Sequence, residues 1–261
     1  MLKNIKLFIL DMDGTIYLED TRFEGTNPFL NTLKSKDVDV VFLTNNSSRN
    51  VESYYQKFLR LSIPVKKKQI YTSGKATALY LLKQKKHPKV YLLGTQDLAD
   101  EFNNLNIKIV NETYDYPDFV VLGFDTTLSY DKIHKASDYI IAGVPFIATH
   151  PDLVCPLKDG KSMPDTGAMI KMFEACTNVS PIIIGKPHQP MVETVLSDFN
   201  YKKDEVCVVG DRLYTDIQMA INAGLKSVLV LSGETTQSLL SKQDITPNFV
   251  VNTIKDIIDL L

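Results

Sequence analysis

The sequence is built from short apolar runs, each of which ends at a polar residue and is followed by a segment with helical spacing. The length of these runs and their content of β-branched residues predict strands. Because the apolarity is continuous rather than alternating, both faces of each strand must be covered. This pattern favours an α/β fold with parallel sheets and helices between the strands. The predicted strands are residues 5–10, 38–43, 90–93, 119–122, 146–148, 181–184, 206–209, 227–231 and 249–251.

The length of the chain indicates more than one folding unit. Its 261 residues exceed the roughly 100 to 200 of a typical domain. Residues 77–179 repeat the α/β pattern, but the polar groups that follow strands lie mostly on either side of them. We therefore expect a catalytic core made of residues 1–76 and 180–261, with residues 77–179 as an inserted, smaller α/β domain.

Charge and composition exclude several classes of protein. The 29 Lys and Arg residues nearly balance the 31 Asp and Glu residues, so the net charge of −2 gives no overall field for nucleic acid or an anionic membrane. No apolar run approaches the length of a transmembrane helix or of a secretory signal. Cys155, Cys176 and Cys207 are widely spaced and odd in number, which predicts no disulfide framework and fits a reducing cytoplasm.

Polar groups with catalytic potential follow four of the predicted strands. Asp11 and Thr44 come directly after their strands, and Lys186 and Asp211 come after one glycine. In open parallel sheets the ligand crevice lies outside the carboxyl ends of the strands. We therefore expect these four side chains to meet at one site.

Two pairs of aspartates stand out within these strand ends. Asp11 and Asp13 are two positions apart, so an extended backbone would point both carboxylates the same way. The alternative is that Asp13 with the following glycine is a turn and Asp11 a helix cap. Asp211 and Asp216 flank a predicted helix start, where we expect Asp216 to act both as a helix cap and as a ligand.

Convergence of these carboxylates would need a cation. Like charges about 4 Å apart cost on the order of 4 kcal/mol per pair at an effective dielectric constant near 20. Oxygen ligands with open positions suit Mg²⁺. The turn Thr44-Asn45-Asn46 and the Lys186 ammonium could hold the oxygens of a transferring phosphoryl group, although a single lysine after a strand is more often a surface residue.

Taken in order, these motifs resemble those of the haloacid dehalogenase superfamily of phosphohydrolases. The resemblance rests on Asp11-x-Asp13-Gly-Thr, Thr44-Asn45-Asn46, Lys186 before a proline, and Gly-Asp211-x₄-Asp216. Residues 71–78, 146–152 and 185–187 are similar to the branch with NagD-type phosphatases, 4-nitrophenylphosphatases and phosphoglycolate phosphatases. That branch carries a large α/β cap between the second and third motifs, so the resemblance implies a Rossmann-like doubly wound core with an inserted cap.

The resemblance implies a role for each motif residue. Asp11 would be the nucleophile that forms an aspartyl-phosphate, because an ionised carboxylate needs no activating base. Asp13 would act first as general acid and then as general base. The remaining implied roles are phosphoryl binding by Thr44, Asn45, Asn46 and Lys186, and Mg²⁺ binding by Asp11, the Asp13 carbonyl and Asp211, with Asp216 ordering the water around the metal.

The chain departs from the family pattern at two places in the cap. Relatives often read Thr-Asn-Pro-Asp and Pro-Gly-x-Gly, whereas this chain has His150 and Asp165 at the second position of each motif. These positions lie where a cap contacts the leaving group, so they are candidates for setting specificity. His150 could bind a polar group of the substrate, or it could be an exposed loop imidazole.

The predicted function is a cytoplasmic, Mg²⁺-dependent phosphatase of a small organic phosphate monoester, such as a sugar phosphate, a nucleotide, phosphoglycolate or 4-nitrophenyl phosphate. One alternative is a dehalogenase-type hydrolase of the same superfamily, whose chemistry needs neither the acid at Asp13 nor a phosphate-directed metal. Another is a non-catalytic phospho-acceptor or regulatory protein. The expected partner is the substrate alone, with no nucleic acid and no membrane, and a homodimer is an option because cap-to-cap dimers occur among relatives.

Overall fold

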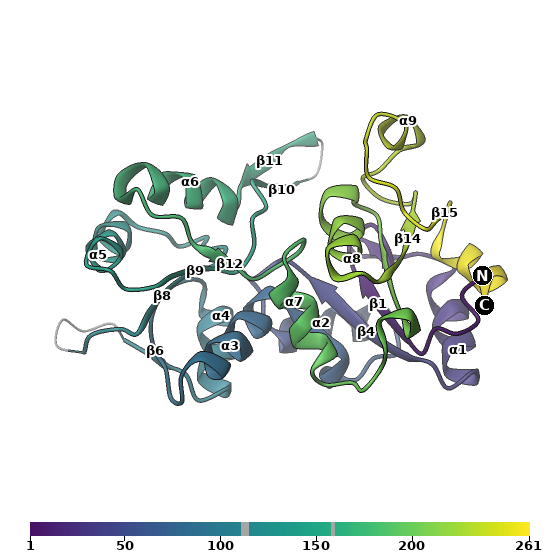
Figure 1. The fold of residues 1–261 in the computed structure, drawn as a ribbon, viewed down its shortest axis with the longest axis horizontal. Helices are drawn as coiled ribbons and strands as arrows, with labels where there is room; N and C mark the ends of the chain where they lie inside the picture. Colours follow the sequence, from purple (N-terminus) through teal and green to yellow (C-terminus); the bar gives the residue numbers. More distant parts are fainter. Residues whose placement is uncertain (111–114, 158–159) are drawn as a thin grey trace. The chain divides into compact units, whose positions relative to one another are not determined.

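The computed structural model describes residues 1–110, 115–157 and 160–261, which form two compact units (Figure 1). The first unit comprises Met1–Thr44, Glu52–Tyr71 and Lys186–Leu261, and the second comprises Asn45–Val51 and Thr72–Gly185. Residues 45–51, 72–76 and 180–185 therefore belong to the second unit, whereas the sequence pattern assigned them to the core.

The first unit contains a six-stranded sheet in the order β15-β14-β13-β1-β4-β5. Strand β1 pairs in parallel with β4 on one side and with β13 on the other, and β13, β14 and β15 continue in parallel. The strand order thus reverses between β1 and β13, which makes the crevice between them the topological switch point. The strands are β1 (Leu7–Asp11), β4 (Asp39–Thr44), β5 (Ile70–Thr72), β13 (Val206–Gly210), β14 (Lys226–Val230) and β15 (Phe249–Val251).

Burial in this unit explains the continuous apolar runs. Residues 7–10 of β1 have no exposed surface, because the sheet is covered on both faces. Phe8 of β1 packs on Phe29 with ring centroids 5.5 Å apart, and Phe42 of β4 packs on Phe58 with centroids 4.8 Å apart. The helices of this unit are α1 (Thr26–Ser35), α2 (Val51–Arg60, whose first residue belongs to the second unit), α7 (Gln189–Leu196), α8 (Gln218–Ala223) and α9 (Gln237–Leu240).

The second unit contains a five-stranded parallel sheet in the order β12-β9-β8-β6-β7. Its strands are β6 (Lys89–Leu93), β7 (Lys108–Ile109), β8 (Phe119–Leu122), β9 (Phe146–Ala148) and β12 (Ile182–Ile183). Helices α5 (Tyr130–Ile141) and α6 (Thr166–Thr177) cover one face of the sheet, and α3 (Ser73–Gln84) and α4 (Gln96–Asn104) lie on the other (Figure 1). Phe173 of α6 packs on Phe146 of β9 with centroids 5.6 Å apart, which anchors the core of this unit.

The predicted α/β class and parallel sheets are confirmed, and every predicted strand is present with ends shifted by at most a few residues. The described residues also contain elements that the pattern did not predict: β5, β7 and the antiparallel hairpins β2 (Tyr17–Leu18) with β3 (Thr21–Arg22) and β10 (Val154–Pro156) with β11 (Ser162–Pro164). None of the helices in the described ranges has both the length and the hydropathy that crossing a membrane requires.

Candidate active site

Three strand ends of the first-unit sheet carry polar residues toward the switch point. Asp11 is the last residue of β1, Thr44 is the last residue of β4, and Asp211 directly follows β13. Lys186 arrives differently, because the strand before it, β12, belongs to the sheet of the second unit. The four groups therefore do not all follow strands of one sheet, and Lys186 is the first residue of the chain after it re-enters the first unit.

Lys186 lies between two carboxylates of the first unit. Its Nζ is 2.5 Å from Oδ1 of Asp11 and 2.7 Å from Oδ1 of Asp216, and the residue is only 3% exposed. Burial alone would lower the pKa of this ammonium, but the charges of Asp11 and Asp216 outweigh burial and raise it. Lys186 is therefore a permanent cation beside the predicted nucleophile.

A group of three aspartates adjoins this lysine. Asp11, Asp211 and Asp216 each offer a carboxylate oxygen, and these oxygens lie within 4.8 Å of one another. Burial and the neighbouring carboxylates raise the pKa of Asp211, and burial raises that of Asp216 even though Lys186 opposes the shift. Oδ1 of Asp211 is buried and has no hydrogen-bond partner among the described residues. An acidic, oxygen-only group with an unsatisfied buried oxygen fits a hard divalent cation.

Glycines allow the backbone to approach the Asp211 carboxylate. A Cβ atom at Gly14 would lie 2.5 Å from Asp211 Oδ2, and one at Gly233 would lie 2.0 Å from the same oxygen. Gly14 also has a φ angle of +87°, which favours glycine. The backbone N–H of Glu234 donates to Asp211 Oδ2 at 2.7 Å. The loop after β14 therefore holds Asp211, a contribution that no sequence motif had indicated.

Asp13 is more accessible than Asp11 and Asp216, with 56% of its side chain exposed. Loss of hydration raises the pKa of Asp13, the Lys57 ammonium opposes this shift, and the charge of Asp11 adds to it. The Lys57 Nζ is 3.9 Å from Asp13 Oδ2 and 4.0 Å from the centre of the Tyr17 ring. A carboxyl group with a raised pKa suits a general acid. The sequence could not identify Lys57 as a neighbour of Asp13, because it is one of several charged residues on helix α2.

Asn45 and Asn46 belong to the second unit, and their side chains form hydrogen bonds there. The Asn45 amide donates to Asp152 Oδ1 at 3.1 Å. Oδ1 of Asn46 accepts from the backbone N–H of Ser48 at 2.8 Å. Contact of either side chain with substrate remains a prediction, and both side chains have a structural partner.

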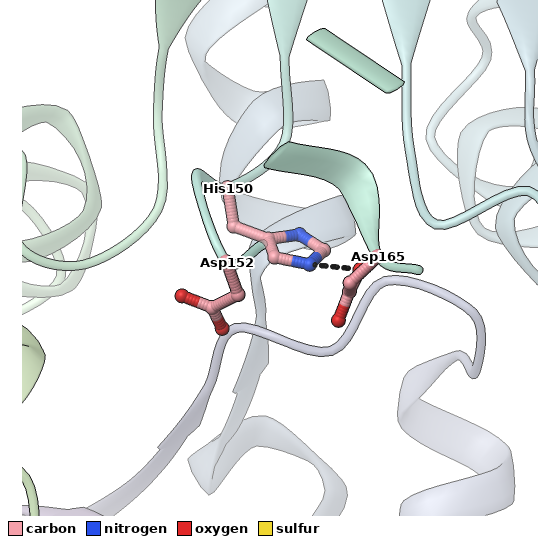
Figure 2. A group of neighbouring side chains, drawn as sticks. All are labelled: His150, Asp152 and Asp165. Carbon is pink, nitrogen blue, oxygen red and sulfur yellow. Dashed lines mark hydrogen bonds and ion pairs between the residues drawn. The ribbon is translucent and has the colours of Figure 1, made fainter. Parts of the chain in front are cut away.

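His150 is completely buried in the second unit, so its interpretation as an exposed loop imidazole is wrong. Its Nε2 lies 2.9 Å from Asp165 Oδ1, and Figure 2 shows the ring pointing toward that carboxylate. Its Nδ1 lies 3.0 Å from the Thr149 hydroxyl. His150, Asp152 and Asp165 also offer ligand atoms within 4.8 Å of one another, but each of the three already has hydrogen-bond partners.

The expected helix cap at Asp216 is not formed. Helix α8 begins at Gln218 after a π-helical turn over Leu213–Ile217, and its first residues have no side-chain cap. Asp216 instead accepts a hydrogen bond from the backbone N–H of Arg212 at 3.2 Å through Oδ2, and its Oδ1 contacts Lys186. Helix α8 ends at Gly224, whose φ angle of +68° favours glycine.

Two family models match the chain. The haloacid dehalogenase-like hydrolase model matches residues 8–108, and the HAD-hydrolase-like model matches residues 183–257. The chain is 30% identical to the 5′-nucleotidase YutF of Bacillus subtilis over 255 residues, with 98% of each protein covered. It is also 30% identical to the acid sugar phosphatase of Staphylococcus aureus over 257 residues, again with 98% of each covered.

Solved structures agree with these relatives. The 4-nitrophenylphosphatase from Thermotoga maritima is 41% identical, superposes with a TM-score of 0.94, and is matched over 99% of this chain and 98% of its own. The p-nitrophenyl phosphatase from Archaeoglobus fulgidus is 27% identical with a TM-score of 0.93, over 98% of this chain and 99% of its own. Similarity in sequence and fold over nearly the full length shows that this chain belongs to the haloacid dehalogenase-like hydrolases.

Proposed function

We propose that this chain is a phosphatase that hydrolyses a small organic phosphate monoester, with Asp11 as the nucleophile. The observation that carries the proposal is the contact of the Lys186 ammonium with Asp11, beside the buried carboxylates of Asp211 and Asp216. A nucleophilic carboxylate next to a fixed cation is suited to attack on an anionic phosphoryl group. The relatives named as nucleotidase, sugar phosphatase and nitrophenyl phosphatase act on esters of this class.

The first half of the reaction transfers the phosphoryl group to the protein. A carboxylate oxygen of Asp11 attacks phosphorus, the bond from phosphorus to the ester oxygen breaks, and the leaving oxygen takes a proton from Asp13. Thr44 and Lys186 hold the phosphoryl oxygens, together with the backbone N–H groups of the turn at Asn45 and Asn46. The raised pKa of Asp13 supports its part as the proton donor.

The second half regenerates the protein. Asp13, now ionised, takes a proton from a water molecule, and the water oxygen attacks phosphorus of the aspartyl-phosphate. Inorganic phosphate leaves and the Asp11 carboxylate is restored. One residue thus serves as acid and then as base, which requires that its pKa lie closer to neutrality than that of an ordinary aspartate.

Asp11, the backbone carbonyl of Asp13 and Asp211 would hold Mg²⁺, and Asp216 would order its water ligands. The unsatisfied buried oxygen of Asp211 and the raised pKa values of Asp211 and Asp216 support a resident cation. When bound, Mg²⁺ supplies positive charge that offsets the charge of the aspartates and of the phosphoryl oxygens.

The site favours this function over its alternatives. A dehalogenase would have no use for a proton donor at Asp13 or for the cation that the buried aspartates indicate. A non-catalytic regulatory protein would have no use for the acid and base role of Asp13. The dehalogenase and regulatory alternatives each predict that no phosphate is released from a monoester.

We place the protein in the cytoplasm, which agrees with its three free cysteines. The proposed partners are the phosphate ester and a second copy of the chain. Light scattering coupled to size-exclusion chromatography tests the dimer.

The proposed function is tested by phosphate release from a panel of monoesters in the presence of Mg²⁺. The wild-type chain should release phosphate, Asp11→Asn should abolish turnover while the circular dichroism spectrum is unchanged, and a chelator should stop the reaction until Mg²⁺ is added back. Asp20→Asn, at an exposed position of the same unit, is the matched control. Full turnover by Asp11→Asn would exclude Asp11 as nucleophile, and full activity in chelator would exclude the metal.

A further inference from the structure

The two departures from the family pattern are in contact with each other. His150 and Asp165 share the hydrogen bond at 2.9 Å, in the interior of the second unit (Figure 2). Asp165 is also the N-cap of helix α6, where its Oδ1 accepts from the backbone N–H of Thr166 at 2.6 Å. Both nitrogens of the His150 ring are partnered and the residue is 0% exposed. Both ring nitrogens of His150 therefore bind groups of the protein, so the imidazole is not available to a ligand.

The loop from Thr149 to Asp152 lies directly on the start of helix α6. The backbone N–H of Gly167 donates to the Asp152 carbonyl at 2.7 Å. A Cβ atom at Gly167 would lie 2.1 Å from the Pro151 carbonyl oxygen, so only glycine permits this approach. The His150 to Asp165 bond adds a side-chain link between the same two segments, which fixes the loop at both ends.

This loop in turn holds Asn45 and Ser47. The Ser47 hydroxyl lies 2.9 Å from the Thr149 hydroxyl, and the Asn45 amide donates to Asp152 at 3.1 Å. Thr149 therefore connects Ser47 to the His150 ring in one chain of hydrogen bonds. Hydrogen-bonded chains of this kind lose more than one bond when a member is removed, because each group orients the next.

The same loop holds Gly185. The backbone N–H of Gly185 donates to the Thr149 carbonyl at 2.8 Å, and a Cβ atom at Gly185 would lie 2.7 Å from Asn45 Oδ1 and 2.8 Å from the His150 Cβ. Asn45 and Gly185 therefore contact the same loop, although 140 positions separate them in the sequence. Asn45 is the residue after Thr44, and Gly185 is the residue before Lys186.

We infer that His150 and Asp165 act together as positioning residues for the phosphoryl-binding pair Thr44 and Lys186. The pair fixes the loop on helix α6, and the loop fixes Asn45 and Gly185, the chain neighbours of Thr44 and Lys186. The inference rests on the proposed function of Thr44 and Lys186. Because both neighbours bear on phosphoryl binding, the effect of the pair is common to all phosphate esters and does not depend on the leaving group.

The test compares His150→Asn, Asp165→Gly and the double variant with the wild type. Each single variant leaves the other member of the His150 to Asp165 hydrogen bond buried without that partner, whereas the double variant removes both members of the bond. We expect each single variant to lower kcat/KM about tenfold, by the same factor for every ester of a panel, and to weaken inhibition by inorganic phosphate to a similar degree. The double variant should lose clearly less than the product of the two single losses, although the Asp165 cap of helix α6 and the contact of His150 with Thr149 remain lost in it. His134→Asn is the control, since His134 forms an exposed pair with Asp138 at 3.7 Å.

Three results would overturn the inference while the wild type remains active. The first is a loss confined to some esters with unchanged inhibition by phosphate, which would mean a direct role in ester selectivity. The second is single variants that match His134→Asn. The third is a double variant whose loss equals the product of the two single losses, which would mean that the residues act independently. If a single variant fails to fold, a double variant that folds supports coupling, and a double variant as unstable as that single variant contradicts it. A wild type that hydrolyses no ester would instead refute the proposed function.

Discussion

The ammonium nitrogen of Lys186 lies 2.5 Å from Oδ1 of Asp11, and both groups are largely removed from water. Replacing Lys186 with Met keeps most of the length of the side chain but removes the charge that offsets the nucleophile and holds phosphoryl oxygens. We expect kcat for 4-nitrophenyl phosphate to fall by about 10²- to 10³-fold. The melting temperature should also fall, because Asp216 loses its buried partner. Lys202→Met, at an exposed site, should change neither quantity. A Lys186→Met enzyme with wild-type kcat would contradict the assignment.

Asp13 should matter most for esters whose leaving group needs a proton. With Asp13→Asn we expect turnover of an alkyl phosphate to fall by about 10²- to 10⁴-fold. With 4-nitrophenyl phosphate, whose leaving group needs little protonation, the first step should survive and the second should stall. Rapid-mixing measurements should therefore show a burst of 4-nitrophenol followed by slow release of phosphate. Alkyl phosphate turnover at the wild-type rate would show that Asp13 is neither the acid nor the base.

Lys57 should set the pH range in which Asp13 can donate its proton. The Lys57 ammonium lowers the pKa of Asp13 against the effect of burial, so Lys57→Met should raise this pKa further. Since the first step needs the protonated acid, the basic limb of the kcat/KM profile should move to higher pH. Lys67→Met is the matched control, because Lys67 lies farther along the chain on the surface and pairs with Glu52. A basic limb that moves to lower pH, or not at all, would contradict this coupling.

Glu101 predicts a pH dependence of stability in the second unit. Burial raises its pKa above the ordinary value of 4.5, while hydrogen bonds from Thr72 and from the backbone of Val51 partly oppose the shift. Below pH 4.5 the carboxyl group is protonated in both states and carries no penalty. As the pH rises through the window between 4.5 and the raised pKa, the folded state keeps a proton that the unfolded state has lost, so stability falls.

Replacing Glu101 with Gln removes this penalty. The difference in the free energy of unfolding between Glu101→Gln and the wild type should be constant below pH 4.5 and should shift in favour of the variant as the pH rises above it. Urea titrations at a series of pH values measure this difference. Glu24→Gln, at an exposed site, should show no such trend. A trend in the opposite direction would mean that Glu101 is ionised and stabilising in the folded state.

The fold class could be predicted from the sequence because buried parallel strands leave a continuous apolar signal. Residues 7–10 of β1 show it in full, since each is buried. Strand β5 was missed because its three residues follow a lysine-rich stretch and are too few to form a pattern. Strand β12 was predicted, but not that it joins the other sheet, because apolar content says nothing about which strand is its neighbour.

The candidate site could also be predicted only in part from the sequence. The spacing of the motifs identified Asp11, Asp211 and Lys186, which the structure places together. Spacing could not identify Lys57, whose approach to Asp13 depends on how helix α2 packs. It could not predict the burial of His150 either, because its partner Asp165 lies 15 positions later and is brought near by a helix start and a tight glycine contact.

The segment Asn45–Val51 belongs to the second unit although it lies between two stretches of the first, so the backbone passes between the units at 44–45, 51–52, 71–72 and 185–186. No single uninterrupted stretch of the gene therefore encodes the second unit. A chimaera that takes this unit from another family member must transplant residues 45–51 together with 72–185. If only residues 72–185 were replaced, Ser47 would no longer meet its own partner Thr149, and Val51 would no longer meet Glu101. Both hydrogen bonds would then depend on whichever residues the other protein has at these positions.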